Sequence, residues 1–265
     1  MMDRSWKIWA VGVLALSIIL PGVVESETMD FSYEDWQQVL ETFVDEKGFV
    51  DYAGLRDDRA ALDRFLEQLG AQGPQSTPRL FPEREGRLAY YINAYNALVF
   101  QGVLELDADA STVWGFSKTG YGFFVRMKVE LDGQEMSLKK LEDNLVREGF
   151  KDPRIHAALN CASVGCPRLP REPFLPETLD AQLDEAIKEF VSEERNCSVD
   201  LEAATVTLSK ILDWFRDDFE NYPQPLGQGG GELIDYINRY RAPNAQIPTD
   251  LKIKFAAYDK TLNRQ

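Results

Sequence analysis

The sequence predicts an α+β fold, a mainly helical single domain with a small antiparallel sheet or hairpins, over residues 27–265. In several long segments apolar residues recur three and four positions apart, which is the period of an amphipathic helix. Alternation of apolar and polar residues is confined to a few short segments, as is typical of strands. The chain is also 44% hydrophobic and 11% aromatic, which is enough to fill the core of one large domain.

Helices are expected wherever the apolar residues keep the helical period. The expected helical segments are 33–46, 62–69, 85–102, 138–148, 179–191, 209–219 and 233–240. The segment 85–102 is apolar on all sides, which is typical of a helix buried in the core. We therefore expect the other helices to pack around it.

The strand signals are shorter. Residues 123–131 alternate between apolar and charged side chains, which predicts a half-buried strand. Asp132 and Gly133 form a strong hairpin turn signal, so residues 134–136 are expected to pair back. A second small hairpin is expected from residues 199–201 and 205–208, and a last strand over 251–255. Loops rich in glycine or proline should join these elements.

Residues 1–26 have the form of a secretory signal peptide, with Arg4 and Lys7 before an apolar run and small residues before the expected cut. The alternative is a retained membrane anchor, but the run of about 13 residues is shorter than the roughly 20 that span a bilayer. We therefore expect a periplasmic or secreted protein with no stable membrane span after cleavage.

The net charge of −15 marks an acidic protein. Nucleic acids and anionic lipid surfaces are polyanions, so the charge argues against both as partners. A small molecule or a peptide is the expected partner.

The segment Asp152–Pro170 concentrates the chemistry, because it holds His156, the only histidine of the chain, together with Cys161 and Cys166. An imidazole can lower the pKa of a thiol and so produce the nucleophilic thiolate. Five residues separate His156 from Cys161, which points them apart on a helix and to opposite faces of a strand. A direct pair therefore requires the chain to bend near Asn160.

The three cysteines leave more than one possibility. In an oxidising compartment at most one disulfide can close within the chain, so one thiol stays free. A Cys161–Cys166 disulfide is one option, and a Cys166–Cys197 disulfide would leave Cys161 free and reactive. The CxxxxC spacing with a single histidine is loose for zinc, so no metal or other cofactor is predicted.

Asn93 and Asn96 lie three positions apart on the helix expected to be buried, hence on one face. A buried amide must be hydrogen-bonded, or it costs about 1–3 kcal/mol. These two amides either tie down a loop or orient a catalytic side chain or a ligand.

Four ordered motifs resemble the bacterial, exported branch of the family named domain of unknown function 547: YYINAYNALVF, DPRIHAALNCASVGCPRL, LSKILDWFRDDF and YDKTLN. The resemblance covers about residues 50–263 and implies one α+β domain with no activity to transfer. It implies that the family's site includes Asn93, Tyr95, Asn96, His156 and Cys161.

This chain departs from the family pattern at two positions. Glu142 is followed by Asp143 where the family usually has a histidine, which removes one imidazole. Lys260 stands where the family more often has an aromatic residue. We therefore do not expect a mechanism in this chain that relies on that histidine.

These observations favour a thiol-dependent hydrolase or acyl transferase in which Cys161 is the nucleophile and His156 the base or its orienter. Asn93 or Asn96 would position the imidazole or an oxyanion, and Glu142 or Asp259 would supply a carboxylate. The alternative is a non-catalytic binding or scaffold domain with a structural Cys161–Cys166 disulfide. Thiol–disulfide exchange is a third possibility, although redox enzymes use CxxC spacing.

Overall fold

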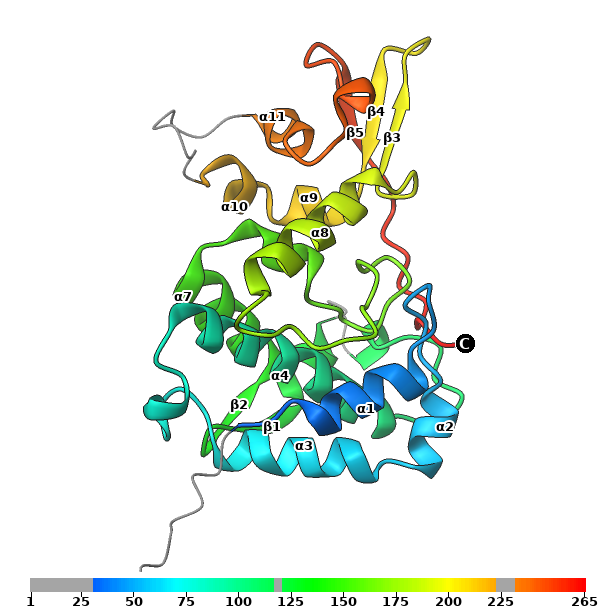
Figure 1. Ribbon diagram of the computed structural model, residues 1–265. Coiled ribbons are helices and arrows are strands. Elements are labelled where there is room, and N and C mark those ends of the chain that lie inside the picture. The colour runs from blue at the N-terminus through cyan, green and yellow to red at the C-terminus, as the bar shows by residue number, and fades with distance from the viewer. Residues whose placement is uncertain (1–30, 117–120, 223–231) are drawn as a thin grey trace, which may run out of the picture. The chain divides into compact units, whose positions relative to one another are not determined.

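The computed structural model describes residues 31–116, 121–222 and 232–265 (Figure 1). The predicted signal segment, residues 1–26, and the glycine run at 227–231 lie outside the described residues. Among the described residues no helix has both the length and the apolar character needed to cross a membrane.

The described residues have the predicted α+β architecture, mainly helical with two small sheets. The helices are α1 (Glu34–Phe43), α2 (Tyr52–Asp57), α3 (Ala60–Ala71), η1 (Pro78–Leu80), α4 (Arg84–Leu104), η2 (Trp114–Phe116), α5 (Gly122–Arg126), α6 (Leu138–Lys140), η3 (Leu141–Arg147), α7 (Glu148–Phe150), η4 (Pro153–Ala157), α8 (Leu179–Ser192), α9 (Lys210–Trp214), α10 (Arg216–Glu220), α11 (Leu233–Asn238) and η5 (Pro243–Ala245). The strands are β1 (Lys128–Leu131), β2 (Gln134–Ser137), β3 (Cys197–Asp200), β4 (Thr205–Leu208) and β5 (Lys252–Phe255).

The longest helix, α4, is the central element of the first hydrophobic core. Nearly all of its side chains beyond the first turn are buried, including both asparagines, as its apolar composition on every side predicts. Its neighbours α1 and α3 each bury one apolar stripe, because their apolar residues recur at helical spacing. The side chains that α4 directs outward are therefore enclosed by other parts of the chain.

The prediction of a strand over residues 123–131 is wrong in its first half. Residues 122–126 form the short helix α5, and only Lys128–Leu131 pair as β1. Phe123 and Phe124 are adjacent and both buried, which a strand with one buried face does not allow, whereas Val125 is exposed. The hairpin turn at Asp132 and Gly133 is confirmed, since both have positive φ and Leu131 pairs with Gln134.

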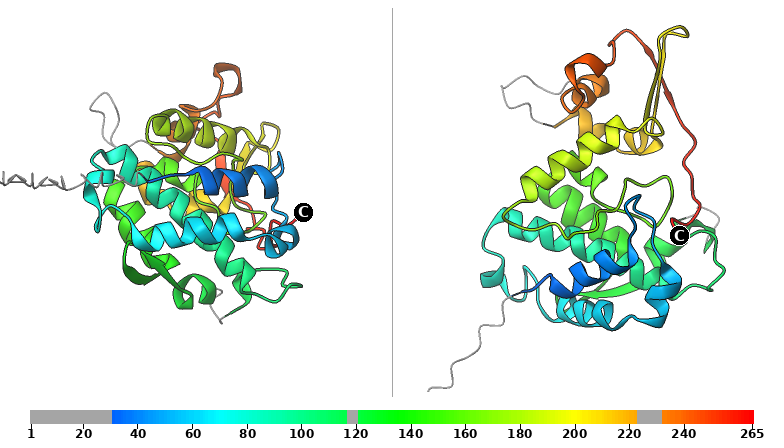
Figure 2. Two further views of the ribbon diagram at one scale, coloured as in Figure 1. Left: turned by 60° about the horizontal axis from the view of Figure 1, so that its bottom comes forward. Right: turned by 45° about the vertical axis from the view of Figure 1, so that its right-hand side comes forward.

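The two sheets differ in their pairing. Strands β1 and β2 form an antiparallel hairpin, and β3 pairs antiparallel with β4. The last strand, β5, pairs with β4 in parallel, with Val206 opposite Ile253, so the second sheet is mixed rather than purely antiparallel. Figure 2 shows β5 continuing into the C-terminal segment, which runs back toward the elements around α4.

Residues 31–265 form one compact unit that contains two hydrophobic clusters. The first surrounds α4, and the second is formed by α8 to α11 and the mixed sheet. Ile155 and Ala158 belong to the first cluster and Ala157 to the second, while the Tyr258 ring packs against both. The segment that carries His156 and Cys161 therefore lies where the two clusters meet.

Candidate functional site

The chain leaves its helical path after Ala157 and turns at Ala162, next to Cys161. The 3-10 helix η4, with the Asp152 side chain as its N-terminal cap, ends at Ala157. Further on, Ala162 has a positive φ of 61°, and the Asn160 side chain closes the turn by accepting a hydrogen bond from the Ala162 N–H at 2.8 Å and donating one to the Pro167 carbonyl at 2.9 Å. The bend makes residues 161–166 a tight loop, which we call the cysteine loop.

Asn96 on α4 holds the chain that leads into the cysteine loop. Its amide donates to the Ala158 carbonyl at 3.0 Å, and its oxygen accepts from the Asn160 N–H at 2.9 Å. Both groups are buried, so each hydrogen bond satisfies a backbone group that would otherwise lack a partner. Asn96 is thus a positioning residue for Cys161, and it does not line the pocket described below.

The cysteine loop brings Cys161 and Cys166 together. Their Sγ atoms are 2.8 Å apart, and the Cys161 backbone N–H donates to the Cys166 Sγ at 3.0 Å. The Tyr258 hydroxyl lies 3.1 Å from each sulfur. All three cysteines are free thiols, and Cys197 is buried in the second cluster. The site therefore holds a dithiol bridged by one phenolic hydroxyl.

The C-terminal segment, residues 256–265 after β5, places Tyr258 beside the sulfurs. The Gly165 N–H donates to the Asp259 carbonyl at 2.9 Å, and the Val164 N–H donates to the Thr261 carbonyl at 2.8 Å. A Cβ on Gly165 would lie only 2.8 Å from the Tyr258 ring and 2.9 Å from the Asp259 oxygen. Glycine is therefore needed at position 165 for Tyr258 to approach the loop.

The two thiols have different acidities. Burial alone would raise the pKa of Cys166, but hydrogen bonds from Cys161, from Tyr258 and from the backbone lower the pKa of this thiol below its ordinary value. The hydrogen bond to Cys166 and burial raise the pKa of Cys161 well above its ordinary value. The two thiols therefore titrate as a pair, in which the surroundings favour ionisation of Cys166 over that of Cys161.

Both sulfurs line a pocket of about 370 Å³, which we call the aromatic pocket. Side chains from both hydrophobic clusters form it: Tyr95, Trp114, Tyr121, Phe124, Lys139, Glu142, Arg147, His156, Leu159, Cys161, Cys166, Ile211, Trp214, Phe215 and Tyr258. Trp214 and Tyr121 are more than a third exposed, whereas Cys161 is partly exposed and Cys166 is buried. A ligand that enters past the aromatic rings would thus meet Cys161 first.

His156 lines the same pocket, but its hydrogen bond is to Asp218 and not to a sulfur. Its Nε2 is 2.8 Å from an Asp218 oxygen, and its ring stacks on Phe215 with 4.0 Å between centroids. Arg147 also binds Asp218, with its Nε 2.9 Å from the carboxylate. Within the described residues the imidazole has no hydrogen bond to either sulfur. The expected direct Cys161–His156 pair does not form in this structure.

Burial lowers the pKa of His156, and this effect outweighs the opposing influence of Asp218. Burial would raise the pKa of Asp218, but hydrogen bonds from His156 and Arg147 bring it down to about 2. The two shifts are consistent if a neutral imidazole donates its Nε2–H to a carboxylate whose charge Arg147 balances. A neutral imidazole of this tautomer keeps Nδ1 as a proton acceptor.

Glu142 also lines the aromatic pocket and accepts a hydrogen bond from the Tyr95 hydroxyl at 3.1 Å. Burial raises the pKa of Glu142. The carboxylate expected from the sequence is therefore in the pocket, with Tyr95 beside it. No group of three or more histidine, cysteine, aspartate or glutamate side chains suited to a metal ion occurs in the parts of the chain that the structure describes.

Besides Asn96, two of the residues considered from the sequence lie outside the pocket. Asn93 accepts from the Trp36 indole N–H at 3.2 Å and holds the Phe174 backbone, so its amide is used within the core. Asp259 is exposed and caps its own turn by accepting from the Thr261 N–H. The geometry offers no catalytic role to either side chain.

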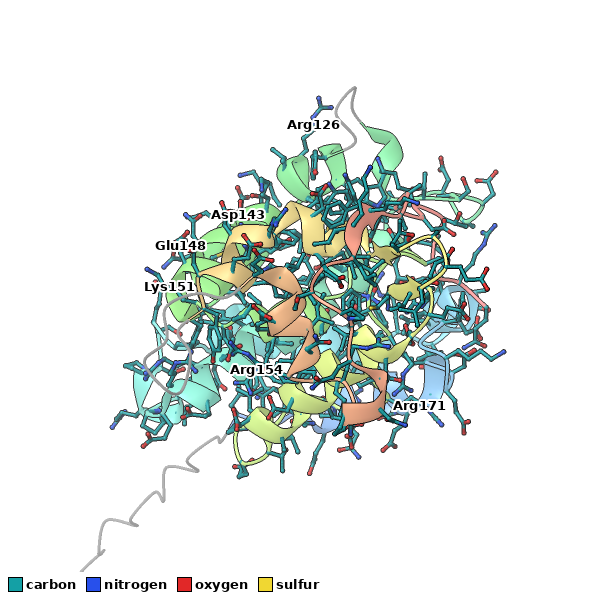
Figure 3. The ribbon with its side chains drawn as sticks, turned by 90° about the horizontal axis from the view of Figure 1, so that it is seen from above. Arg126, Asp143, Glu148, Lys151, Arg154 and Arg171 are labelled. Carbon is teal, nitrogen blue, oxygen red and sulfur yellow. The ribbon has the colours of Figure 1, made fainter. Side chains whose placement is uncertain are left out.

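Asp143, at the position where the resemblance leads one to expect a histidine, is paired with basic side chains and does not line the aromatic pocket. It pairs with Lys139 at 2.6 Å and with Arg147 at 3.1 Å. Figure 3 shows Asp143, Glu148 and Lys151 following one another along one edge of the ribbon. The missing imidazole is thus replaced by a carboxylate that belongs to a surface ion-pair network.

Sequence reasoning missed Tyr258 and Asp218, and it gave the Cys161–Cys166 pairing only as one of several options. Two of the quoted motifs, LSKILDWFRDDF and YDKTLN, contain Asp218 and Tyr258. These motifs were the available signal, but Tyr258 is 97 residues from Cys161 in the sequence. Neither helical nor strand periodicity reports a contact over that separation.

Residues 80–191 match the family model described as protein of unknown function, DUF547. The match confirms the resemblance over this segment, which includes α4, His156 and both cysteines of the dithiol. Membership of a bacterial, exported branch stays a prediction. Neither the curated proteins nor the solved structures include a significant match.

Proposed function

We propose that this chain is a thiol-dependent hydrolase or acyl transferase with Cys161 as the nucleophile. The observation that carries the proposal is the Cys161 thiol, which is partly exposed in the aromatic pocket with a second sulfur 2.8 Å away. A nucleophilic thiol needs a base that takes its proton as it attacks. The Cys166 sulfur, which is in contact with Cys161, is placed to take that proton.

In this proposal the proton of Cys161 moves to the Cys166 thiolate while the Cys161 sulfur attacks an acyl carbon. The Tyr258 hydroxyl, 3.1 Å from both sulfurs, stabilises whichever of them carries the negative charge. His156 is a neutral base on the same pocket wall, held by Asp218. It is available for the second half of the reaction, in which a water or an acceptor hydroxyl must lose a proton.

The pocket favours an acyl donor with an apolar or aromatic body. Trp114 and Trp214 line the pocket, and Trp214, which is more than a third exposed, provides a flat face against which such a body can stack. The pocket volume of about 370 Å³ suits a small molecule or the side chain of a peptide. Nucleic acid is an unsuitable partner because of the net charge of −15. The expected export to the periplasm or the medium is part of the same proposal.

The test is a panel of aryl esters and thioesters assayed with the reduced protein, with intact-mass detection of an acyl adduct. We expect turnover with an adduct on Cys161, and loss of at least about a hundredfold in Cys161→Ala because the nucleophile is removed. Cys197→Ala is the matched control and should keep the wild-type rate, since Cys197 lies outside the pocket. Full turnover by Cys161→Ala would rule out the assignment.

The second candidate is the binding or scaffold domain with a permanent Cys161–Cys166 disulfide, which the short separation of the two sulfurs favours. A structural disulfide would resist mild reductants in the folded protein and would stabilise the fold by about 2–4 kcal/mol. The two functions are separated by counting thiols on the purified protein before and after mild reduction. A disulfide that opens only on unfolding supports the scaffold.

A further inference from the structure

We infer that Cys161 and Cys166 form a reversible dithiol–disulfide couple that exchanges with small disulfides entering the aromatic pocket. This is a redox activity of the site, and it does not depend on acyl transfer. The surroundings of the two sulfurs supply each part that exchange requires: a partner sulfur in contact, an order of attack, and a donor for the leaving thiolates.

The first part is the contact between the sulfurs. A disulfide bond is about 2.0 Å long, so the sulfurs at 2.8 Å need to approach by less than an ångström to bond. The backbone that carries them is already fixed. Asn160 closes the base of the cysteine loop, and Arg195 donates to the carbonyls of Val164 and Cys166. Formation of the Cys161–Cys166 disulfide therefore requires little rearrangement of the chain.

The second part is the order of attack, because the two cysteines differ in exposure and in acidity. Cys161 is partly exposed in the aromatic pocket, whereas Cys166 is 3% exposed and accepts the Cys161 backbone N–H. Exposure points to Cys161 as the attacking sulfur, while acidity places the resting thiolate on Cys166. Both observations are satisfied if the Cys166 thiolate takes the Cys161 proton as Cys161 attacks.

The exchange then balances in two steps. Cys161 sulfur attacks a disulfide RS–SR′, which forms a Cys161–SR bond, breaks the S–S bond and releases R′S⁻, while the Cys161 proton passes to Cys166. Cys166 then gives its proton to solvent and attacks the Cys161 sulfur. The intramolecular disulfide forms and RS⁻ leaves. The protein dithiol is oxidised by two electrons and the incoming disulfide is reduced by two.

The third part is Tyr258. Its hydroxyl lies at the same distance, 3.1 Å, from both sulfurs, so it can donate to the thiolate on either side of the exchange. Trp114 and Trp214 pack around the Tyr258 ring, with centroids 5.6 and 4.8 Å away. An aryl disulfide therefore has both flat faces to stack on and a hydrogen-bond donor beside its sulfur.

The experiment uses the full, prereduced protein with 4,4′-dithiodipyridine as the probe, and it follows thiopyridone release and the mass of the product. We expect wild type to release two equivalents in a fast phase and to end with a Cys161–Cys166 disulfide in the peptide map. Cys166→Ser should release one fast equivalent and retain a thiopyridyl group on Cys161. Cys197→Ala is the control and should behave as wild type, because Cys197 is buried away from the pocket.

Tyr258→Phe keeps the ring and removes the hydroxyl, so it should slow the fast phase about tenfold, the effect of losing one hydrogen bond to a charged group. The inference is overturned if wild type retains a stable thiopyridyl adduct on Cys161, or if the fast phase oxidises neither Cys161 nor Cys166. If Cys166→Ser does not fold, the wild-type stoichiometry and peptide map still decide. Acyl turnover lost in Cys161→Ala, without disulfide closure in wild type, would retain the proposed function and reject the couple.

Discussion

His156 is a buried histidine that donates a hydrogen bond to a carboxylate yet stays neutral at pH 7. Its side chain is 2% exposed, so the charged imidazolium would lose nearly all its hydration. Asp218 offsets part of this loss, but Arg147 already balances the charge of Asp218. The pair is therefore a neutral donor and a carboxylate, which leaves the imidazole able to act as a base.

The charge state of His156 can be measured directly, because the chain has a single histidine. We expect its ring signals in an NMR titration of the folded protein to shift with a midpoint below the ordinary pKa of 6.5, since burial favours the neutral form. Asp218→Asn should lower this midpoint further, because it removes the charge that favours the imidazolium. A midpoint above 6.5 would instead indicate an imidazolium–carboxylate ion pair.

The lowered pKa of His156 also makes the stability of the folded protein depend on pH. The folded pKa of His156 lies below the unfolded value, so the unfolded chain binds the proton first as the pH falls. The contribution of His156 is therefore complete above about pH 6.5 and declines as the pH falls below it. Asp218 contributes in the same direction at lower pH, since its pKa is lowered to about 2 and its contribution declines from about pH 4 downward.

At the scale of elements, α4 carries two asparagines that hold different parts of the chain. Asn96 holds the residues that lead into the cysteine loop, and Asn93 holds the Phe174 backbone and the Trp36 indole. The sequence predicted that both amides are buried and hydrogen-bonded. It left open whether they tie down a loop or line a site, because the partners are far away in the sequence.

The two asparagines form a matched pair for mutagenesis. Asn93→Ala and Asn96→Ala should each lower the free energy of unfolding by about 1–3 kcal/mol, because each leaves buried backbone groups without partners. Only Asn96→Ala should also slow the reaction of the dithiol with an aryl disulfide, since it loosens the chain next to Cys161. Denaturant unfolding and thiopyridone release measure the two effects. Equal slowing in both variants would contradict a positioning role specific to Asn96.

The elements also show what sequence patterns can predict. Helices such as α3 and α8 follow from the local spacing of apolar residues, since the buried stripe lies within one segment. The strand predicted over 123–131 was half wrong because the adjacent Phe123 and Phe124 are buried by packing that local alternation does not encode. The dithiol could be foreseen only as one of several cysteine pairings, and Tyr258 beside it could not be foreseen at all.

At the scale of the whole molecule, the C-terminal segment joins the two hydrophobic clusters. After β5 in the second cluster it passes the cysteine loop and reaches α2 and the turn before it in the first cluster. There Asn263 accepts from the Tyr52 hydroxyl at 3.0 Å, and the Val50 N–H donates to the Asn263 carbonyl at 2.9 Å. Asn263 is buried, so these bonds anchor the segment that carries Tyr258.

Asn263→Ala should therefore act on the site from a distance. It removes the partner of the buried Tyr52 hydroxyl, which should lower the free energy of unfolding by about 1–3 kcal/mol. The amides of Val164 and Gly165, which donate to the C-terminal segment, should exchange with solvent faster than in wild type. Hydrogen exchange measured by NMR or mass spectrometry checks this. Unchanged protection of both amides would show that the segment is anchored without Asn263.

Cys166 lines the aromatic pocket and also a second cavity of about 380 Å³, whose wall includes the ion pairs Arg168–Glu189 and Arg195–Glu193. One sulfur of the dithiol is thus shared by two cavities of different character. By thermodynamic linkage, if oxidation of Cys166 changes how strongly the second cavity holds a ligand, that ligand changes the oxidation equilibrium by the same factor.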